Sequence, residues 1–472
     1  MPRIAEVGKE SVSTLLRGGR VVAEDFKSTV VADVWIKGAT IAAVGDSLGW
    51  DLPAETRFED VSGSTIAPGL VDSHVHLSYL DAQTEEEQDL YLPIEFRTLV
   101  AAQMASRVLA AGVTTAIVPG TMGNIAVAIR DAIDSGVIVG PRVIAGGRYL
   151  SPYGNYPSWI PNLPTENLIV VSDEAGIRKA VYSQFLDRVD IVKILGSGEG
   201  STSHIPTFLE RDIRLITDLA HLQGKRVFMH ARAGAAAVYG ARAGVDVVLH
   251  GDYMTDQQID EFAKSQSAMS PVLCMAANSA AYGSLVGISE QAADFFRGRV
   301  KASAEVSRKL YDRGVALVAG SESGFGITPH GEWHFREVEL LVEEVGLSPL
   351  EAIKAGTANA AAAVGLGQTT GVVAENKSAD LLVVAGDLEQ DIKSYGDPER
   401  RVLTYAGGRP VRAVEVEERR ILSFERVRRM TTGVLTRRLA ATGTIGSEDA
   451  GSDGLQSSGA ASGASGRSDL WR

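Results

Sequence analysis

The chain contains a single cysteine, Cys274, among its 472 residues. An intrachain disulfide and a cysteine-rich zinc cluster are therefore excluded, and a reducing compartment such as the cytoplasm is expected. No apolar run approaches the roughly 20 residues that cross a bilayer. Residues 1–10 also mix charges where a secretory leader would be apolar. We therefore expect a cytoplasmic protein with no membrane contact.

Clusters of basic residues are also scarce. The formal net charge is −13, and no group of Lys and Arg is long enough to follow a phosphate backbone. Nucleic-acid binding is therefore not expected. The hydrophobic content of 45% is enough for a large buried core. The length exceeds that of one ordinary domain, so we predict a large domain and a small one.

Short runs rich in β-branched residues lie near both ends of the chain. They cover residues 14–22, 30–36 and 40–46, and then 371–373, 379–387 and 402–411. Such runs, separated by Gly and charged residues, are typical of antiparallel strands. We predict a small discontinuous β-sandwich domain built from residues 1–68 and 369–425.

The middle, residues 69–368, alternates apolar strand-like runs with segments of helical period. Strand candidates are residues 114–118, 142–145, 190–195, 226–230, 246–250, 268–273 and 315–319, and helix candidates include 96–111, 209–223 and 292–312. With the strand before His74 there are eight strands. Parallel strands covered by helices predict an α/β fold, a (β/α)8 TIM barrel. An open dinucleotide-binding sheet would need a Gly-rich loop after its first strand, and none is present.

Residues 426–472 form a C-terminal extension. From about residue 443 it is dominated by Gly, Ser, Ala and acidic residues. Because it has few large apolar side chains to bury, we predict that it is largely disordered from there.

Two histidines, His74 and His76, follow an apolar stretch and are separated by one residue. In an extended chain both imidazoles lie on one face, as metal ligands do. The alternative is a pair of polar strand residues that find ordinary hydrogen-bond partners.

The predicted barrel helps to decide between these two interpretations, because the catalytic residues of a TIM barrel lie at the C-terminal ends of its strands. Lys193, His230, His250 and Glu322 fall there. Together with the two earlier histidines they form a ligand set suited to zinc, cobalt or manganese. Taken singly, each could instead be a satisfied polar core residue, a lysine that extends to solvent, or a carboxylate near a helix N-terminus.

Arg232 lies two residues after His230. It could bind a substrate carboxylate through two hydrogen bonds, or it could form a salt bridge with a neighbouring loop carboxylate. The loop 149–159, which contains Tyr156, is rich in aromatic residues. It could form a wall for an apolar part of the substrate, or it could simply pack onto the barrel.

Several motifs in a fixed order resemble the amidohydrolase superfamily, in its prolidase-like and imidazolonepropionase-like branch. They lie at residues 67–77, 140–142, 190–194, 230–231, 249–251, 329–331, 348–361 and 371–381. The chain is similar to this branch from about residue 14 to 415, and some features resemble molinate-type and phenylurea-type hydrolases.

This resemblance implies a site with two divalent ions, most simply zinc. One ion would be held by His74, His76 and the strand-eight carboxylate, and the other by His230 and His250. Lys193 would bridge them as a carbamate formed with CO2, because a free ammonium cannot bind a cation. A water between the ions would become the nucleophile.

The catalytic residues implied are Glu322 and His250, with substrate contacts from Arg232, His330 and Tyr156. Relatives carry Asp where this chain has Glu322, which moves the carboxylate outward by one methylene. Asp252 is an alternative carboxylate.

The function expected is hydrolysis of an amide-like C–N bond in a small molecule by a homo-oligomer. Candidate substrates are a dipeptide, an N-acyl amino acid, a carbamate, a thiocarbamate or a urea. One alternative is a cyclic amidohydrolase of imidazolonepropionase type. Another is a catalytically inactive binding protein, which would have lost ligand residues.

Overall fold

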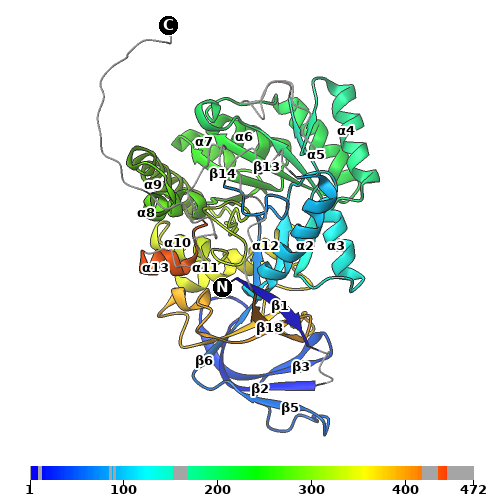
Figure 1. The fold of residues 1–472 in the computed structure, drawn as a ribbon, viewed down its shortest axis with the longest axis vertical. Coiled ribbons are helices and arrows are strands. Elements are labelled where there is room, and N and C mark those ends of the chain that lie inside the picture. Colours follow the sequence, from blue (N-terminus) through cyan, green and yellow to red (C-terminus); the bar gives the residue numbers. More distant parts are fainter. Residues whose placement is uncertain are drawn as a thin grey trace, which may run out of the picture.

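The computed structural model describes residues 2–8, 13–83, 88, 92–152, 167–416 and 434–443 (Figure 1). Its middle part contains two parallel sheets, one ordered β7-β8-β9 and the other β11-β10-β12-β13-β14-β15. The strands are Leu70–Asp72 (β7), Val113–Val118 (β8), Arg142–Ala145 (β9), Tyr149–Ser151 (β10), Leu168–Val170 (β11), Ile191–Leu195 (β12), Arg226–Ala233 (β13), Val247–Tyr253 (β14) and Ala268–Ser270 (β15). Every residue of β8 is buried, as expected for a parallel strand covered on both faces.

Single contacts join the edges of the two sheets. A parallel bridge between Gly146 and Ile191 connects β9 with β12. On the other side, Met269 of β15 bridges to Leu317, and the amide of Ser73 donates to the carbonyl of Ala319 at 2.9 Å. The arrangement is therefore barrel-like, and the α/β prediction is confirmed at that level.

The predicted eighth strand, residues 315–319, is not a regular strand. The amide of Ala319 donates to the carbonyl of Ala355 at 3.2 Å and not to a neighbouring strand. Because this hydrogen bond is not made to a strand, residues 315–319 pair with their neighbours only through isolated bridges. The described residues therefore contain no closed eight-stranded sheet.

Helices surround the parallel strands (Figure 1). The α-helices are Ile94–Ala110 (α2), Ile125–Asp134 (α3), Glu174–Leu186 (α4), Glu210–Leu222 (α5), Gly234–Ala243 (α6), Asp256–Phe262 (α7), Cys274–Tyr282 (α8), Glu290–Asp312 (α9), Arg336–Glu343 (α10), Pro349–Lys354 (α11), Ala360–Ala363 (α12) and Arg437–Thr442 (α13). Short 3-10 turns are Gly200–Thr202 (η1), Gly283–Val286 (η2) and Ile392–Tyr395 (η4), and Ala355–Asn359 (η3) is a π-helical turn.

Local sequence explains where these helices begin and which face they bury. In α5, Ile213, Ile216 and Ala220 recur at helical spacing and are buried. α9 begins after Ser289, whose hydroxyl accepts a hydrogen bond from the third amide of the helix. The predicted helices 96–111, 209–223 and 292–312 correspond to α2, α5 and α9.

Both ends of the chain contribute to one nine-stranded sheet, seen below the helices in Figure 1. Its strands are Arg3–Val7 (β1), Ser13–Val22 (β2), Thr29–Lys37 (β3), Thr40–Gly45 (β4), Arg57–Asp60 (β5), Ser64–Pro68 (β6), Leu381–Ala385 (β16), Arg401–Ala406 (β17) and Arg409–Glu415 (β18). The order is β1-β18-β17-β16-β6-β2-β3-β4, with β5 beside β2. Antiparallel pairing of β16 with β6 joins the two ends, and one buried cluster with Leu16, Ile36 and Leu381 forms its core.

Residues 371–373, predicted as a strand, are not one. Gly371 has φ of 97°, a left-handed conformation that ends extended structure. The Thr370 hydroxyl also donates to Asp380 Oδ2 at 2.9 Å, which holds a turn there.

Residues 434–443, in the predicted C-terminal extension, pack against the main body. Leu435 and Leu439 are buried. The Leu435 amide donates to the carbonyl of Gly326 at 2.8 Å, close in sequence to Glu322. None of the helices among the described residues combines the length and the apolar character of a membrane span.

Candidate functional site

His74 and His76 lie just after β7. The amide of Val75 donates to Ile117 and the amide of His76 donates to Ser323, at 3.0 and 2.8 Å. These bonds keep the chain extended, so both imidazoles point to one side, with ring centroids 4.6 Å apart. Neither ring nitrogen of His74 has a hydrogen-bond partner in the described part of the chain. The unpaired nitrogens of His74 and the common direction of the two rings are compatible with a pair of metal ligands.

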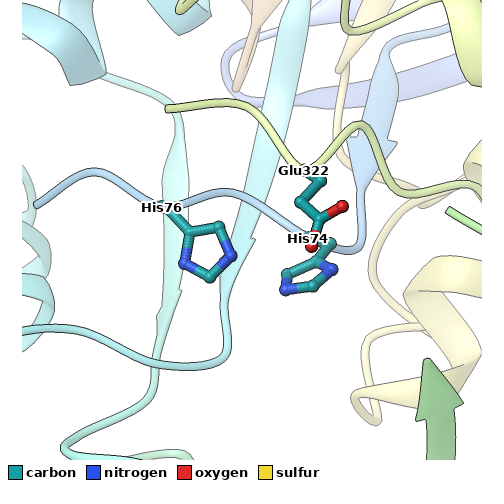
Figure 2. A group of neighbouring side chains, drawn as sticks. All are labelled: His74, His76 and Glu322. Carbon is teal, nitrogen blue, oxygen red and sulfur yellow. The ribbon is translucent and has the colours of Figure 1, made fainter. Parts of the chain in front are cut away.

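Glu322 reaches these histidines from a separate segment, as Figure 2 shows. Gly320 makes the approach possible, because a Cβ there would lie 2.6 Å from Ser73 Oγ and 2.9 Å from His74 Cβ. Glu322 itself has φ of 55°, a strained conformation of the kind that collects at functional sites. One ligand atom from each of His74, His76 and Glu322 lies within 4.8 Å of the others.

His230 and His250 come from neighbouring strands. In the β13–β14 pairing, Ala231 lies opposite His250, and the two histidine rings have centroids 4.6 Å apart. The rings of His74 and His250 are 5.9 Å apart, so the two pairs lie next to each other, and His74, His76 and His230 line one cavity.

Glu199 completes the second group and was not predicted. One ligand atom from each of Glu199, His230 and His250 lies within 4.8 Å of the others. A tight turn places it there, because a Cβ at Gly198 would lie 2.3 Å from Thr202 Oγ1. The only sequence signal was its position six residues after Lys193, which by itself indicates no ligand.

Lys193 lies on β12, next to β13, and lines the same cavity. Burial lowers the pKa of Lys193 to about 7, although Glu322 and Glu199 oppose that change. An appreciable fraction of the amine is therefore uncharged at neutral pH.

The protonation states of the side chains at this site favour the binding of cations. Burial lowers the pKa of His74, His76 and His250 well below the usual histidine range, and that of His230 to about 4. The rings are therefore neutral and keep a free lone pair. Burial also raises the pKa of Glu322 to about 7, an effect that Arg232 opposes.

Several buried polar atoms here lack a hydrogen-bond partner among the described residues. They are both ring nitrogens of His74 and His250, Nε2 of His230 and Oε2 of Glu322. Each such atom costs about 1–3 kcal/mol if it stays unpaired. Because a neutral imidazole has one nitrogen with a free lone pair, His74, His230, His250 and Glu322 each offer an unpaired acceptor, and such acceptors fit divalent cations such as zinc.

Arg232 is held by carboxylates on both sides. Its Nε lies 2.9 Å from Glu199 Oε2, and its Nη1 lies 2.9 Å from Asp252 Oδ2. Of the two interpretations of Arg232, this geometry matches the salt bridge. Arg299 of α9 also contacts Asp252 Oδ2 through Nε, at 3.0 Å.

Of the other two expected substrate contacts, only His330 is among the described residues. His330 does not line the cavity, and its Nδ1 lies 2.5 Å from Asp81 Oδ1. Tyr156 is outside the described residues. Tyr149, from the start of the same loop, does line the cavity, and its hydroxyl lies 3.3 Å from His76 Nδ1.

The cavity has a volume of about 340 Å³. Besides the candidate ligands and the arginines, its lining includes the apolar or aromatic side chains of Leu195, Tyr253, Met275, Phe295, Phe296 and Phe325. It can therefore accept a small molecule with a polar end and an apolar end.

Comparisons with known proteins identify the family and agree with the fold. The model of the amidohydrolase family matches residues 65–411, and the chain belongs to this family of hydrolytic enzymes that act on C–N bonds. The superfamily predicted from the sequence motifs is thereby confirmed. Ochratoxinase from Aspergillus niger is 24% identical over 440 residues, which cover 86% of this chain and 88% of that protein.

Solved structures are similar over nearly their whole length. A prolidase complexed with N-methylphosphonate-L-proline has a TM-score of 0.74 and 24% identity, and the match covers 85% of this chain and 99% of that chain. Molinate hydrolase has a TM-score of 0.68 and 21% identity, with 85% and 95% covered. At this identity the likeness establishes the fold, which is TIM-barrel-like with a second domain.

Proposed function

We propose that this protein is a metal-dependent hydrolase that cleaves an amide-like C–N bond in a small molecule with an apolar part and a carboxylate. The observation that carries the proposal is the presence of two adjacent three-residue ligand groups with unpaired buried polar atoms, of which every residue except His250 lines one cavity. An inactive binding protein would have no reason to keep both groups.

Two divalent ions bound by these groups, zinc in the simplest case, would acidify a water molecule and polarise the scissile carbonyl. In such a site the Glu322 carboxylate, next to both histidines, would be the group placed to take a proton from the attacking water and to pass it to the departing nitrogen. Although Glu is one methylene longer than the usual Asp, the Glu322 carboxylate still lies within 4.8 Å of ligand atoms of His74 and His76.

Lys193 forms an N-carboxylated side chain in this proposal. The uncharged amine adds to the carbon of CO2 and loses one proton, which gives an anionic carbamate. Its lowered pKa supports this reaction at neutral pH. The carbamate supplies an oxygen ligand between the two groups.

Arg299 is the proposed contact for the substrate carboxylate, in place of Arg232. Within the described residues only Nε of Arg299 has a recorded partner, which leaves its two terminal nitrogens for a bidentate contact. Phe295 and Phe296 on the same helix line the cavity, and they suit an apolar group near that carboxylate. N-acyl amino acids and dipeptides combine these features.

We also propose that the middle part of the chain is a complete (β/α)8 barrel. Residues 315–319 act as the eighth strand of a (β/α)8 barrel, supported by the bridge from Leu317 to Met269 and the bond from Ser73 to Ala319. The nine-stranded sheet is the small domain made from both ends of the chain.

The test is a substrate panel with zinc-loaded and chelator-treated protein. N-acyl amino acids, dipeptides, carbamates, thiocarbamates, ureas and cyclic amides would each be followed by release of the amine or by ring opening. We expect hydrolysis of acyclic substrates that bear a carboxylate, lost on metal removal. Exclusive turnover of cyclic amides would favour the imidazolonepropionase-type alternative, and no turnover of any member would refute the proposal.

A further inference from the structure

Glu199 faces a histidine ligand in a way that an ordinary ion pair does not explain. Its Oε1 lies 3.1 Å from His230 Nε2, yet this nitrogen has no hydrogen-bond partner of acceptable geometry. The His230 ring forms its hydrogen bond with the backbone of Gly198. Since Nε2 is unpaired, that bond uses Nδ1, and Nε2 keeps a lone pair that lies close to a carboxylate oxygen but is not aligned with it for a hydrogen bond.

Two acceptor atoms at this distance repel each other unless a cation lies between them. His250 adds a third acceptor, because both of its ring nitrogens are buried and lack a partner among the described residues. An ion at this point would satisfy all three side chains.

The second carboxylate oxygen of Glu199 is held by a side chain that is not itself a proposed metal ligand. Arg232 Nε contacts Oε2 at 2.9 Å, and Arg232 is in turn anchored through Nη1 by Asp252. Asp252 also contacts Arg299. This chain of alternating charges fixes one carboxylate oxygen and leaves the other directed at His230, as outer partners do for metal ligands.

The backbone fixes the same arrangement. The amide of Gly196 donates to the carbonyl of His230 at 2.7 Å, and the amide of Arg232 donates to Ser197 Oγ at 2.9 Å. The segment before Glu199 therefore runs along β13, which carries both the histidine and the arginine. The approach of Glu199 to His230 follows from this pairing.

We propose that Glu199 is a direct carboxylate ligand of the ion held by His230 and His250, and that Arg232 is the residue that positions it. The second ion then has three protein ligands of its own, whatever the state of Lys193. The inference rests on the metal centre of the proposed function but not on its reaction.

The experiment is a titration of chelator-treated protein with cobalt(II), followed by calorimetry and by visible absorption of the bound ion. Wild type should bind two ions per chain. In Glu199→Gln, which keeps the size but removes the charge, the second ion should bind at least about 100-fold more weakly, beyond the ~10–100-fold effect of losing an outer partner. The first ion should bind as in wild type.

Glu305→Gln is the matched control, because Glu305 is exposed on α9 and pairs with Lys309; this variant should bind both ions normally. Arg232→Lys should weaken binding of the second ion by about 10–100-fold and leave the affinity for the first ion unchanged. Thermal unfolding of each metal-free variant verifies the fold.

Two wild-type affinities and an unchanged cobalt spectrum in Glu199→Gln would overturn the assignment. An unchanged second affinity in Arg232→Lys would overturn the positioning role. If wild type binds two ions in a Glu199-dependent way but hydrolyses nothing, the proposed reaction fails while this assignment stands.

Discussion

Asp72 accepts a hydrogen bond from the backbone amide of Ser321 at 3.0 Å, which ties the end of β7 to the segment that carries Glu322. The same oxygen accepts from the amide of His74 at 3.1 Å. His334 completes the arrangement, because its Nε2 accepts from Gly331 and its Nδ1 donates to Asp72 Oδ2 at 2.7 Å. One buried carboxylate therefore orients both parts of the first ligand group.

Substitution of Asp72 should selectively weaken binding of the first ion. Asp72→Asn keeps the shape but replaces one acceptor oxygen with a donor, which faces donors on Ser321 and His334. We expect about 10–100-fold weaker binding of the ion held by His74, His76 and Glu322. Calorimetric zinc titration measures it, with exposed Asp256→Asn as the control. Equal affinities in both variants would show that Asp72 has no part in orienting the ligands.

Carbamate formation on Lys193 should depend on pH in metal-free protein. Burial lowers the pKa of Lys193 to about 7, so the reactive amine is scarce well below pH 7 and predominates above it. Incorporation of 13C-labelled bicarbonate, followed by NMR, should rise with pH around a midpoint near 7. Lys193→Arg should show no signal. A midpoint near the ordinary lysine value would mean that burial does not activate this amine.

Arg299 should determine preference for carboxylate substrates. A charge-assisted hydrogen bond contributes about 1.5–3 kcal/mol, so Arg299→Gln should raise KM about 10–100-fold for an N-acyl amino acid. Its neutral amide should be hydrolysed as before. Arg297→Gln, an exposed position on the same helix, is the control. A similar rise for both substrates would remove Arg299 from carboxylate recognition.

Leu435 should contribute to stability from outside the predicted domains. Its side chain is fully buried, and its carbonyl accepts a hydrogen bond from Trp333 Nε1. Leu435→Ala should lower the free energy of unfolding by about 2–5 kcal/mol, measured by urea titration. Exposed Leu222→Ala should change it by less than about 0.5 kcal/mol. A Leu435→Ala protein as stable as wild type would mean that this segment does not hold the loop of Gly326.

The sequence was sufficient to locate the histidines and Lys193. They lie on or directly after apolar parallel strands, and the topology of neighbouring parallel strands brings these side chains together at one site. Glu322 was found in the same way, although its positive φ is a property of the folded turn and not of its strand.

Glu199, Asp72 and His334 could not be predicted in the same way. Glu199 reaches the site through a turn after β12, and His334 through a segment after the barrel-like strands, so no periodicity aligns them. Asp72 lies in the recognised motif, but its role depends on an amide 249 residues later. The two partners of Arg232 likewise come from separate segments, which is why its salt bridges remained one of two alternatives.

Hydrolysis of an N-acyl amino acid during stepwise return of zinc to chelator-treated protein tests the central claim most directly. The account predicts no turnover without metal and a rise that levels near two ions per chain, because both ligand groups are needed. Turnover that survives complete removal of the metal, or reconstituted protein that binds no zinc, would contradict it.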